Sequence, residues 1–203
     1  MSKEPQSIVK STISRIYGRG RGCVFTPNEF LDIGSRSAID LALHRLTAAG
    51  TIRRVARGLY HYPESHTLLG EVAPSVEAVA KALASRDQIK LQPSGAYAAN
   101  LLGLSEQVPA KVVYLTSGPA RKLKLGKLVM ELRPATSRQL ATAGRASGSV
   151  IAALRYLGKP HVTPGRIARL REVLSKEDRR SLANDLAHAP VWMHSFLRAI
   201  ATD

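Results

Sequence analysis

The side chains best suited to chemistry in this chain are arginines that gather in short groups within the first 60 residues. These groups contain Arg19 and Arg21, then Arg36 and Arg45, and then Arg53, Arg54 and Arg57. A guanidinium group carries five N–H donors and binds a phosphate or the edge of guanine through paired hydrogen bonds. The groups therefore predict contact with a nucleic acid.

Residues typical of enzymes do not form a recognisable set. The six histidines include no His-x-x-x-His or Glu-x-x-His pair, and no Gly-x-Ser-x-Gly motif is present. Cys23 is the single cysteine and is expected to be a buried, inert thiol in a strand. The Gly18-Arg19-Gly20-Arg21-Gly22 segment lacks the Gly-Lys-Ser/Thr of a phosphate-cradling loop. We predict no catalytic residue, no metal site and no cofactor.

The arginine groups fall on a series of elements typical of a winged helix-turn-helix. A helix over 7–17 is followed by a short strand at 23–25, and Thr26-Pro27 is a helix start that Gly34 ends. Ser35 caps a third helix, which Gly50 ends. The β-type runs 51–56 and 59–62 flank Arg57-Gly58 and predict a hairpin, the wing. Residues 1–65 are the predicted DNA-binding domain.

The third helix is the candidate recognition helix. Ile39, Leu43 and Leu46 predict its buried face, so that Ser37, Leu41 and His44 point outward. Its N-terminus is the end that such proteins present to bases. The wing arginines are expected at the DNA backbone or minor groove. The predicted DNA-binding residues are Arg36, Ser37, His44, Arg45, Arg53, Arg54, Arg57, Arg19 and Arg21.

Each of these features also has a simpler interpretation. Polar residues on the third helix can be ordinary solvated side chains, and strand arginines can protect a sheet edge. The loop with Arg19 and Arg21 is predicted to be either a flexible segment touching the DNA backbone or a plain connector.

Residues 66–203 predict a second domain of α+β type, with a small sheet and a helical tail. Helices are expected at 75–86 and 94–102, strands at 89–91 and 112–116, and a hairpin around Gly126-Lys127. The tail has helical segments at 147–157, 164–174, 176–187 and 191–200. The basic run 121–127 is expected to be a solvated strand face or a surface for nucleic acid or an acidic partner.

The charge of the chain indicates a polyanionic partner. The 203 residues include 30 Lys and Arg against 15 Asp and Glu, a net charge of +15. Of this, +5 lies in residues 1–65 and +10 in residues 66–203. No run reaches the roughly 20 apolar residues of a membrane-spanning helix, and the start resembles no signal peptide. We expect a cytoplasmic protein without a membrane partner.

Two segments give the chain a resemblance to the AbiEi family of bacterial antitoxins from type IV toxin–antitoxin and abortive-infection systems. These are the wing segment 54–60 (Arg-Val-Ala-Arg-Gly-Leu-Tyr) and the segment 93–104 (Pro-Ser-Gly-Ala-Tyr-Ala-Ala-Asn-Leu-Leu-Gly-Leu), which the strand 112–118 follows. The resemblance covers most of residues 7–135. It implies a non-enzymatic protein that represses its own operon by binding upstream inverted repeats and counters a nucleotidyltransferase-like toxin. Because one third helix reads only a short site, we also expect two copies of the winged domain on the DNA, either as a homodimer or assembled there. The DNA contacts that the resemblance implies fall on Arg36, Ser37, His44, Arg45, Arg53, Arg54 and Arg57.

Two other functions stay open. The chain can be a winged-helix transcriptional regulator whose second domain binds a ligand or protein. It can also be a basic protein associated with RNA or ribosomes. Preference for duplex DNA over structured RNA would separate the latter from the other two.

Overall fold

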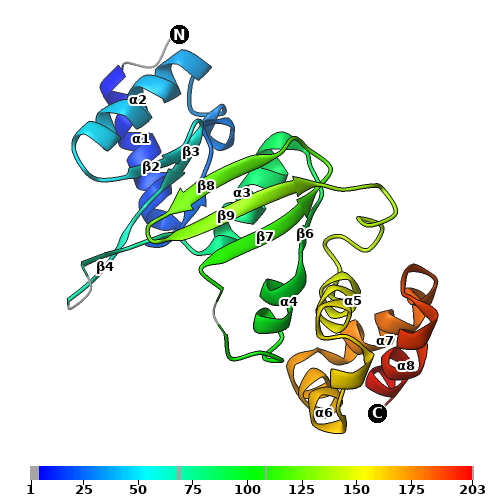
Figure 1. Ribbon diagram of the computed structural model, residues 1–203. Helices are drawn as coiled ribbons and strands as arrows, with labels where there is room; N and C mark the ends of the chain where they lie inside the picture. The colour runs from blue at the N-terminus through cyan, green and yellow to red at the C-terminus, as the bar shows by residue number, and fades with distance from the viewer. Residues whose placement is uncertain (1–4, 68–69, 108, 203) are drawn as a thin grey trace. The chain divides into compact units, whose positions relative to one another are not determined.

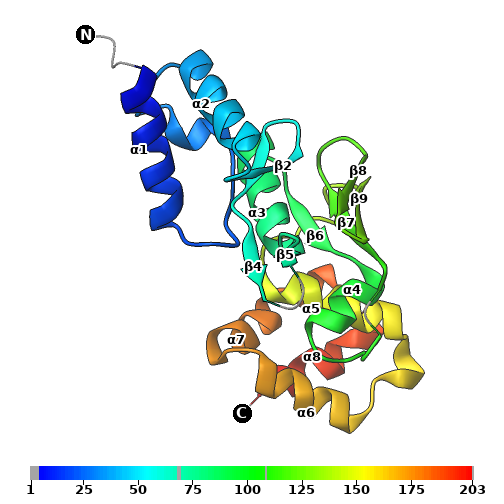
Figure 2. The same cartoon turned by 90° about the vertical axis from the view of Figure 1, so that its left-hand side faces the viewer.

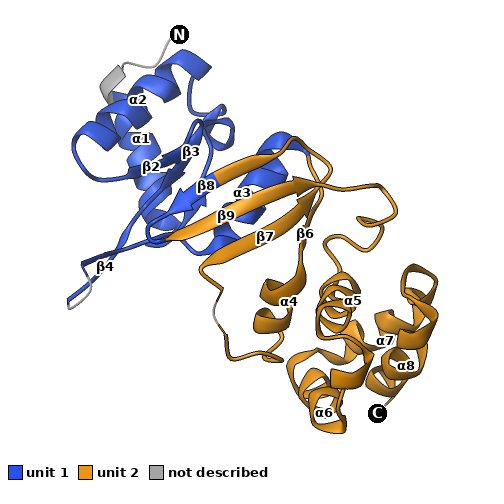
Figure 3. Cartoon of the chain, viewed as in Figure 1, with its two compact units in different colours: residues 1–88, 123–127 blue, residues 89–122, 128–203 orange. Residues whose placement is uncertain are grey.

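The computed structural model describes residues 5–67, 70–107 and 109–202, which form helices and three small sheets. The predicted α+β class is confirmed. The chain divides into two compact units, residues 1–88 with 123–127 and residues 89–122 with 128–203 (Figure 3). No helix in the described ranges is both long and apolar enough to cross a bilayer.

The first unit begins with the elements that the sequence predicts, in the predicted order (Figure 1). They are helix α1 (Pro5–Gly18), strand β1 (Val24–Phe25), the 3-10 helix η1 (Pro27–Phe30), helix α2 (Arg36–Ala48), strand β2 (Arg53–Ala56) and strand β3 (Leu59–His61). The strands form an antiparallel sheet in the order β1-β3-β2. Cys23 lies just before β1 and is partly rather than fully buried; burial still raises the pKa of its thiol.

The helix predicted to start at Thr26-Pro27 is only one turn of 3-10 helix. The Glu29 carboxylate accepts hydrogen bonds from the Thr26 N–H at 2.6 Å and from its hydroxyl at 3.0 Å. These bonds hold the start of the turn, as in a capping box. Ser35 then caps α2 as predicted, because its Oγ accepts the Ala38 N–H. The chain therefore reaches α2 through a tight, well-capped turn.

A cluster of aliphatic and aromatic side chains holds this part of the unit together. Ile16 of α1, Ile39 and Leu43 of α2, and Phe25 and Phe30 are fully buried in it. The Phe25 and Phe30 rings meet edge to face at 5.5 Å, a favourable geometry for aromatic pairs. Helices α1 and α2 lie side by side in Figures 1 and 2.

The first unit extends beyond the predicted domain boundary after residue 65. Strands β4 (Glu64–His66) and β5 (Gly70–Val72) form an antiparallel hairpin that the sequence analysis did not predict. Helix α3 (Val76–Asp87) follows, and the Arg86 guanidinium donates a hydrogen bond to the Arg57 carbonyl at 2.6 Å. This bond and the packing of α3 against β1 join α3 to the first unit.

The second unit combines strands with a helical C-terminal half. Its elements are β6 (Leu91–Pro93), α4 (Gly95–Leu101), β7 (Lys111–Thr116), β9 (Leu128–Pro134), α5 (Ala146–Leu157), η2 (Lys159–His161), α6 (Pro164–Val173), α7 (Lys176–Asn184), η3 (Leu186–His188), η4 (Val191–Met193) and α8 (His194–Ala201). With β8 (Arg121–Leu125), the strands have the order β6-β7-β9-β8, in which β7 and β9 are parallel. Figures 1 and 2 show α4 beside α5 and the last helices gathered near them.

A buried carboxylate fixes the start of α5 to the turn after α7. Asp185 is 2% exposed and accepts hydrogen bonds from the Arg145 guanidinium, at 2.5 Å, and from the Ser147 hydroxyl. A buried charge is tolerated when it is paired and hydrogen-bonded in this way. Asp185 therefore joins two segments 40 residues apart.

This arrangement predicts that Asp185→Ala lowers the free energy of unfolding by about 2 kcal/mol, because it leaves Arg145 and Ser147 without their shared acceptor. Urea denaturation followed by circular dichroism measures the change. The matched control is Glu172→Ala, whose partner Arg169 is exposed, and its effect should stay below about 0.5 kcal/mol. Equal effects of the two variants would contradict the role given to Asp185.

Candidate nucleic-acid interface

Helix α2 presents a mixed polar and apolar face to solvent. Ser37, Leu41 and His44 follow each other at helical spacing and are all exposed, with Leu41 48% exposed. The buried residues of α2 include Ile39, Leu43 and Leu46, as the sequence predicts. Because hydroxyl, imidazole and aliphatic groups can all contact base edges, this face has the chemistry of a groove-reading surface.

Arg36 is held in a fixed position at the N-terminus of α2. Its Nε donates to Asp40 at 2.9 Å and its Nη1 donates to the Asn28 side-chain oxygen at 2.9 Å. The side chain is 54% exposed. Two of its five N–H groups are used, so Nη1 and Nη2 keep donors for an external acceptor. The two bonds orient the guanidinium and leave its other N–H donors open.

The other predicted residues of α2 differ in their local contacts. The Ser37 hydroxyl lies 3.2 Å from that of Ser35. His44 and Arg45 are exposed, and within the described ranges neither side chain has a hydrogen-bond or ion-pair partner. Arg45 is therefore a free cation on this helix.

The three arginines of the β2–β3 hairpin are not equivalent. Arg53 forms a bidentate ion pair with Glu71 of β5, at 3.0 and 2.5 Å, and also donates to the Gly50 carbonyl. Arg54 has a single long hydrogen bond, 3.4 Å, to the Ala56 carbonyl. Arg57, at the turn, has no side-chain partner among residues 5–67, 70–107 and 109–202. A register shift between Arg54 and Ala56 also breaks the strict alternation of sides that a regular strand would show.

The glycine-rich loop before β1 is anchored by its arginines. Arg19 pairs with Glu29 at 2.5 Å and lies over the Phe30 ring. Arg21 lies 5.0 Å from the centre of the Tyr62 ring and donates to the Pro63 carbonyl. Because both side chains contact residues of the first unit, they do not form a flexible arm. We assign them to the packing of this unit.

A hollow of about 260 Å³ in the first unit is lined by residues that lie far apart in the sequence. Its lining includes Arg53 and Arg54 of β2, Glu71 of β5 and Lys124 of the basic run 121–127. Lys124 is exposed. No local motif links it with the hairpin, because the two segments are about 70 residues apart and only the fold makes them neighbours.

The same hollow is bordered by a buried histidine. His61 of β3 is 2% exposed, and its Nε2 has no hydrogen-bond partner among the described residues. Burial lowers the pKa of His61, while the Glu71 carboxylate acts in the opposite direction. Burial in the folded unit therefore favours the neutral form of the imidazole.

Comparison with known proteins assigns the chain to a family. It belongs to the family described as "Family of unknown function (DUF6088)", whose match spans residues 12–182. No curated protein matches the chain. The crystal structure of the RV2827C protein from Mycobacterium tuberculosis is similar with a TM-score of 0.47 at 15% identity, over 98% of this chain and 82% of that chain.

The lowered pKa of His61 predicts a pH-dependent stability. The contribution of neutral His61 is complete above its unfolded pKa of about 6.5 and is lost as the pH falls toward the lower folded pKa, because the unfolded chain binds the proton more readily. Urea midpoints should fall between about pH 7.5 and about pH 5.5. His61→Phe should flatten this dependence, whereas His66→Phe, at an exposed histidine of β4, should leave it unchanged. A wild-type slope retained in His61→Phe would exclude His61 as its source.

Proposed function

We propose that the chain is a DNA-binding antitoxin of the AbiEi type that represses its own operon. The observation that carries the proposal is the set of cations on α2 and the β2–β3 hairpin that have no carboxylate partner within the described ranges. Further support comes from the sequence resemblance and the net charge of +15. We propose that the protein acts in the cytoplasm, where it would encounter both the operator and the toxin.

The first unit supports the proposal through its order of elements. The series α1-β1-η1-α2-β2-β3, with the sheet order β1-β3-β2, is the arrangement expected of a winged helix-turn-helix. Helix α2 would be the recognition helix, and the β2–β3 hairpin would be the wing. A short 3-10 turn stands where the first helix of the motif is expected.

The distribution of ion pairs in the first unit supports DNA contact by particular residues. Arginines near the glycine loop and the β4–β5 hairpin are neutralised by carboxylates: Arg15 by Asp32, Arg19 by Glu29 and Arg53 by Glu71. Arg45, Arg54 and Arg57 have no carboxylate partner in the described ranges. Cations of this kind bind phosphates and release the condensed counterions of DNA.

The antitoxin role is proposed for the second part of the chain. The second unit has its own apolar core, built from α4, α5 and the C-terminal helices. A core of this kind is independent of the residues proposed to bind DNA. Neutralisation of the toxin and repression should therefore be separable by side-chain substitution in the full chain.

The proposed DNA contacts predict a ranked set of variants. Arg45→Ala, Arg54→Ala and Arg57→Ala should each weaken binding to all duplexes and flatten the slope of log K against log salt by about 0.9 per lost phosphate contact. Arg53→Ala should have a smaller effect, because Glu71 already pairs with Arg53. Fluorescence anisotropy at several salt concentrations measures both quantities. The control Lys81→Ala removes an exposed cation of α3. If it reduced binding as much as Arg57→Ala does, general charge rather than this surface would account for the affinity.

The separable roles predict the behaviour of the double variant Arg54→Ala/Arg57→Ala. The full-length variant is co-expressed with a nucleotidyltransferase-like toxin encoded by a neighbouring gene. It should protect growth as well as the wild type does. It should fail to repress a reporter under the upstream promoter. Loss of protection in parallel with loss of repression, at equal protein level, would contradict the separation.

A further inference from the structure

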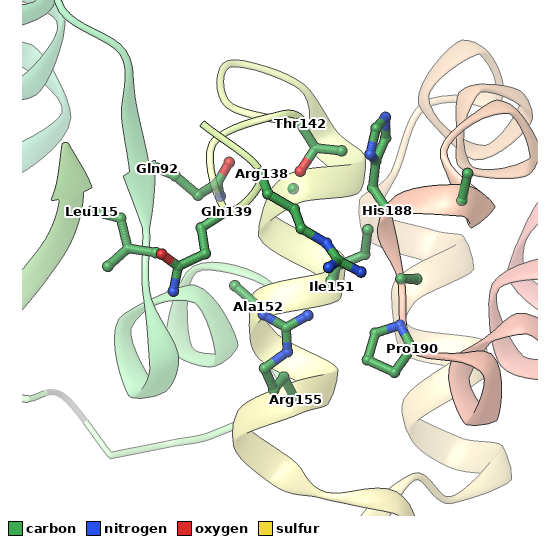
Figure 4. Close-up of a pocket in the computed structure, with 13 residues that line it drawn as sticks. Gln92, Leu115, Arg138, Gln139, Thr142, Ile151, Ala152, Arg155, His188 and Pro190 are labelled. Atoms are coloured by element: carbon green, nitrogen blue, oxygen red, sulfur yellow. The ribbon is translucent and has the colours of Figure 1, made fainter. Parts of the chain in front are cut away.

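The second unit contains a cavity of about 380 Å³ beside helix α5, lined by none of the residues proposed to bind DNA. Its lining comes from β6, β7, the turn between β9 and α5, α5 itself, and the segment 187–190 (Figure 4). This volume lies within the range of pockets that hold small organic ligands.

Among the described residues, the lining of the cavity is basic and includes no acidic side chain. Arg138 comes from the turn before α5, Arg155 from α5 and His188 from η3. Within the described ranges, none of these three side chains has a hydrogen-bond or ion-pair partner. Figure 4 shows the Arg138 and Arg155 side chains extending into the same space beside α5. Two guanidinium groups that converge without a carboxylate form a site for a phosphate group.

A buried polar group gives an independent indication of a ligand. Gln92 of β6 lines the cavity and is 3% exposed, yet its Oε1 has no hydrogen-bond partner among the described residues. Its Nε2 is directed to the Pro93 carbonyl at 3.3 Å and to the Ser149 hydroxyl at 3.5 Å. A buried acceptor without a donor is costly, and a turn of the Gln92 amide from Gly148 toward the cavity would let this oxygen accept an N–H or O–H group from a ligand.

The approach of Gln92 to α5 depends on a glycine. A Cβ atom at position 148 would lie 2.2 Å from the Gln92 Oε1 and 2.5 Å from the Thr142 carbonyl oxygen. Gly148 therefore allows the amide to lie against the first turn of α5. The apolar side chains of Leu115, Ile151 and Pro190 also line the cavity and offer surface for a flat ring.

From this combination, we infer that the cavity binds a nucleoside phosphate. Arg138 and Arg155 hold the phosphate, a donor of the sugar or base reaches the Gln92 oxygen, and the apolar lining contacts the base. The inference does not depend on DNA binding by the first unit.

The test is titration of the full-length protein with AMP, GMP, CMP and UMP. Binding is followed by calorimetry and by the fluorescence of Trp192, the single tryptophan, which lies two residues after Pro190. At least one nucleotide should bind saturably at one site. Adenosine and inorganic phosphate should each bind at least about tenfold more weakly than the best nucleotide, because each lacks part of the contact set.

Variants link that binding to the cavity. Arg138→Ala and Arg155→Ala should each weaken nucleotide binding at least about tenfold without lowering the Tm, because both side chains are exposed. Arg180→Ala, at an exposed cation of α7 outside the cavity, should leave binding unchanged. Gln92→Met keeps the side-chain volume and should weaken nucleotide binding while leaving phosphate binding intact.

Three results would overturn the inference. They are the absence of saturable binding by all four nucleotides, inorganic phosphate binding as tightly as the best nucleotide, and nucleotide binding that is indifferent to Arg138→Ala and Arg155→Ala. Each outcome is distinguishable from a failure of DNA binding, since no DNA is present in the titration.

Discussion

The packing of α2 onto α1 is the constraint on which the proposed interface depends. Ile39 and Leu43 are fully buried against Ile16 and the Phe25–Phe30 pair, and a helix has one rotation that buries all of them at once. That rotation decides that Ser37, Leu41 and His44 reach solvent. The tight turn capped by Glu29 and Ser35 fixes where α2 begins, and so where Arg36 stands. The geometry of the proposed interface is therefore a consequence of core packing.

Carboxylates then divide the arginines into two groups. In one group, pairs such as Arg15 with Asp32 and Arg53 with Glu71 tie loops and hairpins to the first unit. In the other, Arg45, Arg54 and Arg57 keep their charge available. Exposed ion pairs contribute little to stability, but they use N–H donors that would otherwise be open to a phosphate. A count of basic residues treats all these arginines as equally able to bind phosphate. Their contacts show which of them are already paired.

Patterns of neighbouring residues predicted most helices and strands. The features that these patterns did not predict depend on contacts between residues far apart in the sequence. Helical spacing and capping residues placed α2, α3 and α5 through α7 within a few residues, and Ser35, Ser75, Thr163 and Ser175 cap their helices as N-cap side chains. The β4–β5 hairpin is short and exposed, so no apolar alternation marks it. The extension of the first unit to Gln88, the Arg53–Glu71 pair and the meeting of Lys124 with the hairpin all depend on tertiary neighbours. The cavity around Gln92 and Arg155 likewise joins segments that no sequence motif connects.

In the proposed function, α2 and the β2–β3 hairpin recognise the operator of the chain's own operon. Nuclease footprinting of the full-length protein on the DNA upstream of its reading frame tests it most directly. We expect protection of two inverted half-sites about one or two helical turns apart, and we expect Arg54→Ala/Arg57→Ala to lose it. Protection that is absent, or that is equally strong on unrelated DNA of the same length, would contradict it.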